Sequence, residues 1–181
     1  MISLRSEITK TVLNYFFMNP HESLYVNELV QKLHLDKRNL VKKIRELEQE
    51  GILRGGKRGN LKLYSINQEY PLYDAYRNIV LTTLGFERTI KELLKETTGV
   101  KEAYIYGSYA HNNMDVHSDI DILIIGNHAI VPLQGRLNKI QKAINRTINC
   151  SHMDEKEFNK RVKNGDAFIS ALLRQKHIKI M

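Results

Sequence analysis

The feature that most constrains the fold is a Gly-Ser pair followed, ten residues later, by two aspartates at alternate positions. The pair, Gly107 and Ser108, comes directly after the apolar and aromatic segment 103–106, which predicts a buried strand that ends at a glycine turn. The aspartates, Asp119 and Asp121, stand at the start of the apolar segment 120–125, which predicts a second strand. The spacing and the apolar flanks together are typical of nucleotide chemistry.

The residue types in this pattern suit a metal-bound nucleotide. Alternate side chains of a strand point to the same face, so Asp119 and Asp121 can direct their oxygens to one cation, and Mg²⁺ prefers carboxylate, water and phosphate oxygens. Glycine lets the backbone approach a phosphate, and serine offers both an amide and a hydroxyl. We therefore assign Gly107, Ser108 and Ser118 to nucleotide binding and both aspartates to metal binding. The alternative is that the aspartates are solvent-facing strand residues beside a turn.

The Gly-Ser pair, the ten-residue gap and the Asp-Ile-Asp segment resemble the core motif of the DNA polymerase beta-like nucleotidyltransferase superfamily, most closely its minimal branch. The resemblance covers roughly residues 86–181. It implies that Gly107 and Ser108 hold nucleotide phosphates and that Asp119 and Asp121 bind Mg²⁺ as catalytic residues. It also implies transfer of a nucleoside monophosphate from a triphosphate to a hydroxyl acceptor, which can be a small molecule or a protein.

Two positions depart from that family pattern. Minimal members often have Gly-Ser-Arg-Ala-Arg-Gly, whereas residues 107–112 here read Gly-Ser-Tyr-Ala-His-Asn, so two cations are missing. The family also has a third carboxylate on a later strand, and the corresponding residue of the predicted strand 146–151 is Asn149. An asparagine cannot act as a general base and adds no charge to a metal site. The domain is therefore either an enzyme or a nucleotide sensor or dimerisation body without turnover.

The first third of the chain has a different pattern. Apolar spacing predicts helices over 2–18 and 26–33, and Asp36 is a suitable N-cap for a third helix that ends near Gly51. Leu40, Ile44 and Leu47 are expected on the buried face of that third helix. Two strands, 52–54 and 61–66, are predicted on either side of a glycine-rich and basic hairpin tip at 55–60.

Three helices and a basic hairpin resemble a winged helix-turn-helix domain over about residues 1–70. The resemblance implies a recognition helix in the major groove of double-stranded DNA, a wing on the phosphates, transcription regulation and a homodimer. The residues that we expect to contact DNA are basic and lie on the third helix or the hairpin: Lys37, Arg38, Lys42, Lys43, Arg45, Lys57 and Arg58. The alternative is a helical interaction or dimerisation domain whose lysines are solvated.

Length and charge agree with this organisation. We expect an α+β protein of three parts: a winged helix-turn-helix at 1–70, a linking helix in 71–85, and a nucleotidyltransferase-like domain with a small mixed sheet flanked by helices at 86–181. Residues 36–62 carry nine Lys or Arg against four acids, and the whole chain has a net charge of +8, so a polyanionic partner is expected. Charge alone does not distinguish DNA from RNA or from nucleotide phosphates.

Other sequence features limit the possible functions. The single cysteine, Cys150, excludes an internal disulfide and is expected to be a buried thiol. The seven histidines show no zinc-binding spacing, although His111 and His117 lie in the loop between Ser108 and Asp119 and could contact phosphate. The chain shows neither an apolar signal core nor an apolar stretch of about 18 residues, so we expect a cytoplasmic protein without a membrane partner.

Overall fold

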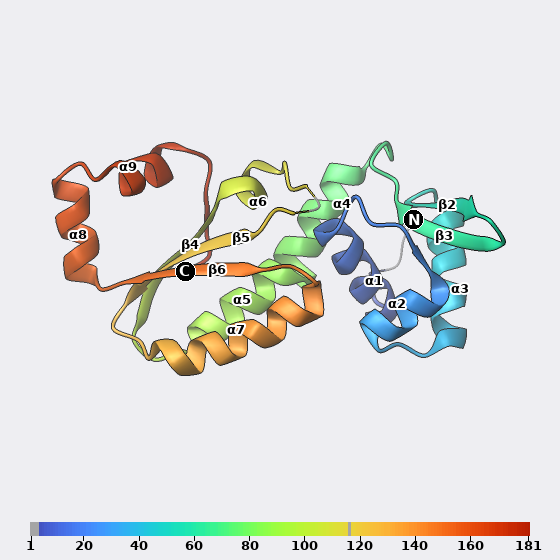
Figure 1. Cartoon of the computed structure of the whole chain (residues 1–181), viewed down its shortest axis with the longest axis horizontal. Helices are drawn as coiled ribbons and strands as arrows, with labels where there is room; N and C mark the ends of the chain where they lie inside the picture. Colours follow the sequence, from blue (N-terminus) through green and yellow to red (C-terminus); the bar gives the residue numbers. More distant parts are fainter. Residues whose placement is uncertain (1–3, 116) are drawn as a thin grey trace. The chain divides into compact units, whose positions relative to one another are not determined.

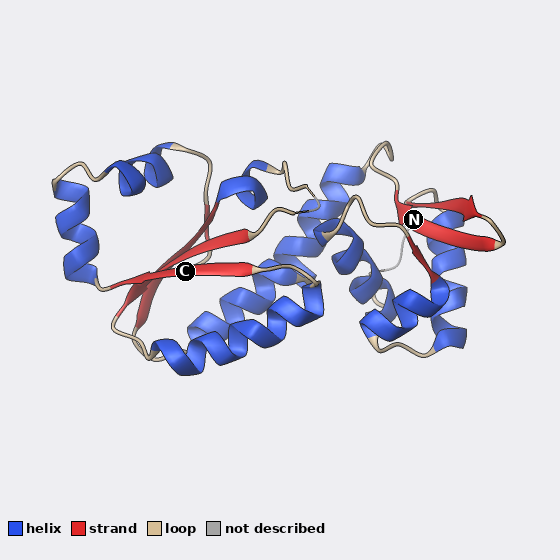
Figure 2. Ribbon diagram, in the orientation of Figure 1, coloured by secondary structure: helices blue, strands red, loops and turns tan. Residues whose placement is uncertain are grey.

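A computed structural model of the chain describes residues 4–115 and 117–181. The protein is α+β, as the sequence predicts, and it divides into two compact units, residues 1–88 and 89–181. Each unit has its own small sheet covered by helices (Figures 1 and 2). The segment after residue 70, which was predicted as a link, belongs to the first unit.

The first unit begins with three helices: α1 (Glu7–Met18), α2 (Val26–Leu33) and α3 (Lys37–Gln49). The ranges of α2 and α3 agree with the prediction, and the Asp36 carboxylate accepts a hydrogen bond from the Asn39 N–H at 2.9 Å. Among the described residues, the first helix, predicted over 2–18, begins only at Glu7. Ser6 has extended backbone angles and its hydroxyl accepts from the Thr9 N–H, which fixes the first turn at Glu7; residues 2 and 3 lie outside the described residues.

The sheet of the first unit contains β1 (Leu24–Tyr25), β2 (Leu53–Arg58) and β3 (Leu61–Ile66). All pairings are antiparallel in the order β1-β3-β2, and β1 was not predicted because two residues carry no periodicity. The prediction of a six-residue hairpin tip is also wrong. The strands pair as far as Arg58 and Leu61, which leaves Gly59 and Asn60 as the turn, with Gly59 at φ +61°.

The core of this unit lies between the helices and the sheet. Leu40, Ile44 and Leu47 of α3 are buried, as predicted, together with Phe16 of α1. Gly51 follows α3 at φ +78°, a conformation that glycine adopts at low cost.

The predicted linking helix over 72–84 divides into two helical segments: α4 (Tyr73–Ile79) and a π-helical segment, η1 (Val80–Leu84). The Thr83 hydroxyl donates to the Ile79 carbonyl at 2.5 Å and so competes with the backbone for that acceptor. This competition favours the wider π-turn over a continuous α-helix.

The second unit has a mixed four-stranded sheet: β4 (Val100–Tyr106), β5 (Ile120–Gly126), β6 (Ile148–Met153) and β7 (Ile178–Lys179). The order is β6-β5-β4-β7, with β5 and β6 parallel and the other pairs antiparallel. The predicted strands at 103–106 and 120–125 are confirmed. The predicted strand at 146–151 instead runs from Ile148 to Met153, because the backbone N–H groups of Asn145 and Arg146 still bond the last turn of the preceding helix.

Helices cover both faces of this sheet (Figure 1). α5 (Phe86–Lys95) and α7 (Ile130–Ile144) lie on one face, and α8 (Glu155–Lys163) and α9 (Ala167–Arg174) lie on the other. A short helix, α6 (Gly107–His111), follows β4 directly.

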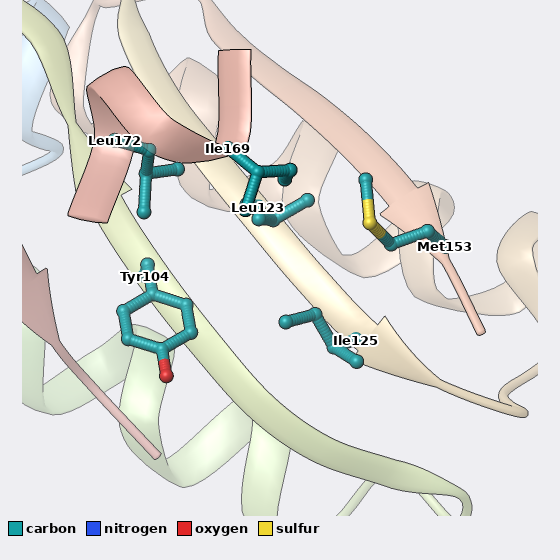
Figure 3. Packing of buried hydrophobic residues seen from close by; sticks show 6 residues of the cluster. All are labelled: Tyr104, Leu123, Ile125, Met153, Ile169 and Leu172. Atoms are coloured by element: carbon teal, nitrogen blue, oxygen red, sulfur yellow. The ribbon is translucent and has the colours of Figure 1, made fainter. Parts of the chain in front are cut away.

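The residues packed beneath α9 show which side chains lie on each face of the sheet. Figure 3 shows Tyr104, Leu123 and Met153 of the sheet packed with Ile169 and Leu172 of α9. Side chains alternate along a strand, so the odd-numbered positions of β5 face α9 and the even-numbered positions face α5 and α7. Among the described residues, no helix has the length and apolar character needed to cross a bilayer.

Candidate functional site

The two predicted metal ligands stand at the beginning of β5, on the face that carries Leu123. Asp121 is directly opposite Tyr106 in the antiparallel ladder, and the residue after Tyr106 is Gly107. The pairing of β4 with β5 therefore brings the glycine turn to the carboxylates, although ten residues separate them along the chain. This is the juxtaposition that the spacing predicts.

Gly107 is in close contact with Asp121. Its φ is +71°, and a Cβ atom added there would lie 2.6 Å from Asp121 Oδ2. Any side chain at this position would therefore strain the backbone and displace the carboxylate. Glycine keeps a cradle open in which both the backbone of the turn and the carboxylate oxygen remain accessible.

Asn149 lies beside both aspartates. It is the neighbour of Asp121 in the parallel ladder, and its Nδ2 donates to Asp119 Oδ2 at 3.1 Å and to Asp121 Oδ1 at 3.4 Å. The predicted third-strand residue is therefore at the site, and it is an exposed amide. Because Asn149 and both aspartates lie together, the three side chains form one polar cluster at the end of the sheet where β5 and β6 begin.

The loop that precedes Asp119 is stabilised by hydrogen bonds within the loop and by hydrogen bonds from Arg146. The Ser118 hydroxyl donates to the Asp115 carboxylate at 2.9 Å and accepts from the Asp115 N–H at 2.9 Å. The buried Arg146 donates through Nη1 to the carbonyls of Asp115, at 2.6 Å, and of Ser118, at 3.0 Å. The Ser118 hydroxyl thus stabilises the loop, while the Ser108 hydroxyl makes no hydrogen bond with other described residues.

Sequence reasoning missed Arg146 and Tyr106. An arginine just before an apolar strand carries no signal that it will be buried, and Tyr106 was read only as a strand residue. The Tyr106 ring packs edge-to-face on Phe168 of α9, with centroids 5.5 Å apart, and burial together with the nearby Asp121 charge raises the pKa of Tyr106. Tyr106 therefore forms the aromatic boundary between the polar cluster and the core beneath α9.

The other candidate residues have local roles. His111 Nδ1 lies 2.8 Å from the Gly107 carbonyl oxygen within α6, and the His117 N–H donates to the Asp115 carboxylate. Burial raises the pKa of Cys150 to about 12, so its thiol stays protonated and is a poor nucleophile. Two grooves among the described residues, of about 340 and 230 Å³, lie along α5 and α7, and none of the site residues lines either of them.

The donor set fits Mg²⁺ as part of a nucleotide complex. Within the described residues no group of three His, Cys, Asp or Glu side chains could hold a metal ion, so the site supplies two carboxylates and one amide. Mg²⁺ is commonly bound by one or two carboxylates plus substrate phosphates and water. Asp119 and Asp121 are partly exposed and Asn149 is exposed, so phosphate and water oxygens can reach the carboxylates from the solvent side.

The basic residues of the first unit gather on the solvent side of α3 and on β2. Arg38, Lys42 and Arg45 are exposed and recur at helical spacing opposite the buried stripe of α3. Lys37 begins the helix, and Lys57 and Arg58 are exposed at the end of β2. Lys43 differs, because it is half-buried and pairs with Glu46 at 2.6 Å.

One comparison with known protein families agrees with the geometry of the second unit. Residues 88–170 match the family model described as polymerase beta, nucleotidyltransferase. A protein from Sulfolobus solfataricus, assigned as a nucleotidyltransferase, has a solved structure that is 24% identical over 41% of this chain and 68% of its own, with a TM-score of 0.28. None of the curated proteins matches the chain. Residues 88–170 thus form a polymerase beta-like nucleotidyltransferase domain.

Proposed function

We propose that this nucleotidyltransferase domain binds a Mg²⁺–nucleoside triphosphate and transfers the nucleoside monophosphate to a hydroxyl acceptor, while the first unit binds double-stranded DNA. The observation that carries the first part is that Asp121 lies against Gly107 and shares the Asn149 amide with Asp119, inside the segment that matches the family model. The acceptor is a small molecule or a protein.

Each residue has a defined task in this proposal. Asp119 and Asp121 hold the ion, Gly107 lets the backbone approach the phosphates, and the Ser108 hydroxyl donates to a phosphate oxygen. Bound Mg²⁺ would neutralise triphosphate charge. The acceptor oxygen forms a bond to the α-phosphorus, the bond to the β-phosphate breaks, pyrophosphate leaves and the acceptor proton passes to water. Asn149 takes no part in proton transfer, because an amide is not a base.

The first test is calorimetric binding of Mg²⁺ with a non-hydrolysable ATP or GTP analogue. Asp119→Asn combined with Asp121→Asn should abolish binding, since it removes the charge that holds the ion. The matched control, Asp154→Asn with Asp166→Asn, makes the same chemical change at the caps of α8 and α9, where asparagine is an equally good cap. Absence of binding to the wild-type protein would reject the proposal.

The second test follows label from an α-³²P nucleoside triphosphate to any acceptor in a cell extract of the protein's source. Transfer is expected with the wild-type protein and not with Asp121→Asn. Label transfer that persists in Asp121→Asn would contradict the assigned site, because the reaction would not depend on its central carboxylate.

The DNA-binding part is supported by the element order and by charge. Three helices followed by a hairpin, with β1 completing an antiparallel sheet, are the arrangement expected of a winged helix-turn-helix. Lys37 and Arg38 stand exposed in the first turn of α3, directly after the Asp36 cap, and the first turn itself contains no acid. Their charges would attract a DNA phosphate to this end of the helix.

A gel-shift series with genomic DNA fragments tests this surface. Replacing Arg38, Lys42 and Arg45 by alanine should weaken binding by about tenfold or more and flatten its salt dependence, since each phosphate contact releases counterions. The matched control replaces three exposed lysines of α8, Lys156, Lys160 and Lys163, and so removes the same charge elsewhere. Equal loss in both variants would indicate a general charge effect and reject the surface.

A second candidate function is favoured by Asn149. An amide in place of a third carboxylate provides neither a base nor further negative charge, which suits a regulator that binds nucleotide, or dimerises through this domain, without turnover. Nucleotide binding without label transfer to any acceptor would support this regulator over the enzyme.

A further inference from the structure

The amide of Asn149 stands where it competes with a cation. Both neighbours are carboxylates, which only accept hydrogen bonds, so the amide presents its Nδ2 to them and gives one N–H to Asp119 and one to Asp121. These are charge-assisted bonds, and they occupy lone pairs on Asp119 Oδ2 and Asp121 Oδ1. A metal ion between the two carboxylates needs the same pair of side chains.

We propose that Asn149 is a positioning residue that makes metal binding depend on the nucleotide. It acts as an internal substitute for the cation: its N–H groups hold the two carboxylates together and weaken their affinity for free Mg²⁺. The inference rests on the proposed function, because the nucleotide is the partner that shifts this balance.

The physical basis is that a bound ion displaces the Asn149 amide from the two carboxylates. For Mg²⁺ to bind both carboxylates, the two amide hydrogen bonds must break, and the exposed Asn149 side chain must turn away or present its oxygen. Free Mg²⁺ must offset this loss and its own reluctant dehydration with only two carboxylates. A bound triphosphate adds oxygen ligands and negative charge, so ion and nucleotide bind better together than separately.

Among the described residues, two neighbours of the cluster are already engaged in other contacts. Tyr106 faces the core beneath α9 through its ring contact with Phe168, and the Asp115 carboxylate is engaged with Ser118 and His117. The side chain at 149, which contacts both carboxylates, therefore sets how strongly they attract an ion.

The test is calorimetric titration with Mn²⁺ and Mg²⁺, with and without a non-hydrolysable nucleotide triphosphate. Asn149→Ala removes the competing donor and should tighten binding of the metal alone by about fivefold or more, given the strength of a hydrogen bond to a charged group. Asn149→Asp, which has nearly the same shape, should tighten it by about tenfold through the added charge. Asn159→Ala, an exposed amide on α8, is the matched control and should change nothing.

A second readout does not depend on the nucleotide. Without metal, Asn149→Asp places a third carboxylate beside two others, so its melting temperature should fall below that of the wild type and recover when Mn²⁺ is added. The wild-type protein should show a smaller metal-dependent rise, because its amide already satisfies the carboxylates.

The outcomes separate the two proposals. Weaker or unchanged metal binding in Asn149→Ala would overturn the inference, since the amide would then be a metal ligand or have no effect on the metal. The proposed function would survive this outcome if the wild-type protein binds Mg²⁺–nucleotide. Tighter metal binding in Asn149→Ala, with no nucleotide binding in any variant, would support the competition between amide and ion and reject the proposed function together with the coupling.

Discussion

At the residue scale, Gly107 is the residue whose identity most directly determines the geometry of the site. Its positive φ ends β4, and its missing Cβ leaves space for the Asp121 carboxylate. The sequence predicted the turn and the carboxylates because apolar flanks marked both strands. It could not show that Asn149 touches both aspartates, since that contact depends on the pairing of β5 with β6.

Gly107→Ala should therefore affect both stability and binding. We expect a loss of about 1–2 kcal/mol in the free energy of unfolding from the left-handed backbone, and loss of Mg²⁺–nucleotide binding because the Cβ displaces Asp121. Gly165→Ala is the control: its φ is +66° but an added Cβ meets nothing within 4 Å. Chemical denaturation and calorimetry would measure the two effects; equal binding by the two variants would contradict the role of the cradle.

Arg146 is the second residue whose substitution should affect the site, because it bonds the loop that precedes Asp119. Arg146→Ala removes the guanidinium that bonds the carbonyls of Asp115 and Ser118, and we expect the free energy of unfolding to fall by about 2–3 kcal/mol. Arg136→Ala removes an exposed arginine paired with Glu96, and should cost at most about 1 kcal/mol. Urea denaturation checks both, and a similar cost at the two positions would show that the loop does not depend on Arg146.

At the element scale, the start of α3 was predictable because the capping side chain of Asp36 precedes apolar spacing, whereas the Ser6 cap of α1 was missed. Strand lengths were not predictable, because Gly55 and Gly56 read as turn residues until β3 supplies their partners. Short elements such as β1 and the change to a π-turn in η1 depend on tertiary pairing and side-chain bonds that no local pattern records.

The cap of α3 offers a test at this scale. Asp36→Ala should lower the free energy of unfolding of the first unit by about 1 kcal/mol, because the Asn39 N–H loses its acceptor. Asp36→Asn keeps a capping oxygen and should be nearly neutral. Thermal unfolding followed by circular dichroism distinguishes these variants, and an equal loss in both would point to charge rather than capping.

At the scale of the whole molecule, a histidine pair introduces pH dependence into the second unit. His128 Nε2 and His152 Nδ1 are 2.9 Å apart, and burial, with His128 adding repulsion at His152, lowers the pKa of both below the ordinary 6.5. Folding then favours the neutral rings, so their contribution to stability is complete above pH 6.5 and is lost as the pH falls through the lower pKa values of the folded state.

Hydrogen exchange of the β5 and β6 amides, corrected for intrinsic rates, should therefore show weaker protection at pH 5.5 than at pH 7.5. His152→Gln should reduce this difference, while His21→Gln, an exposed residue of the first unit, should leave it unchanged. A difference that is the same in all three proteins would assign the pH dependence to other groups.

The last strand of the sheet has a consequence for handling the protein. β7 pairs with β4 at Tyr104 and Ile105, and the Ala103 carbonyl and N–H bond with Ile180 and Met181. This short segment therefore covers one border of the most buried part of β4, whose backbone groups would otherwise be free to recruit a strand from another molecule. Deletion of residues 178–181 would remove that cover and promote aggregation.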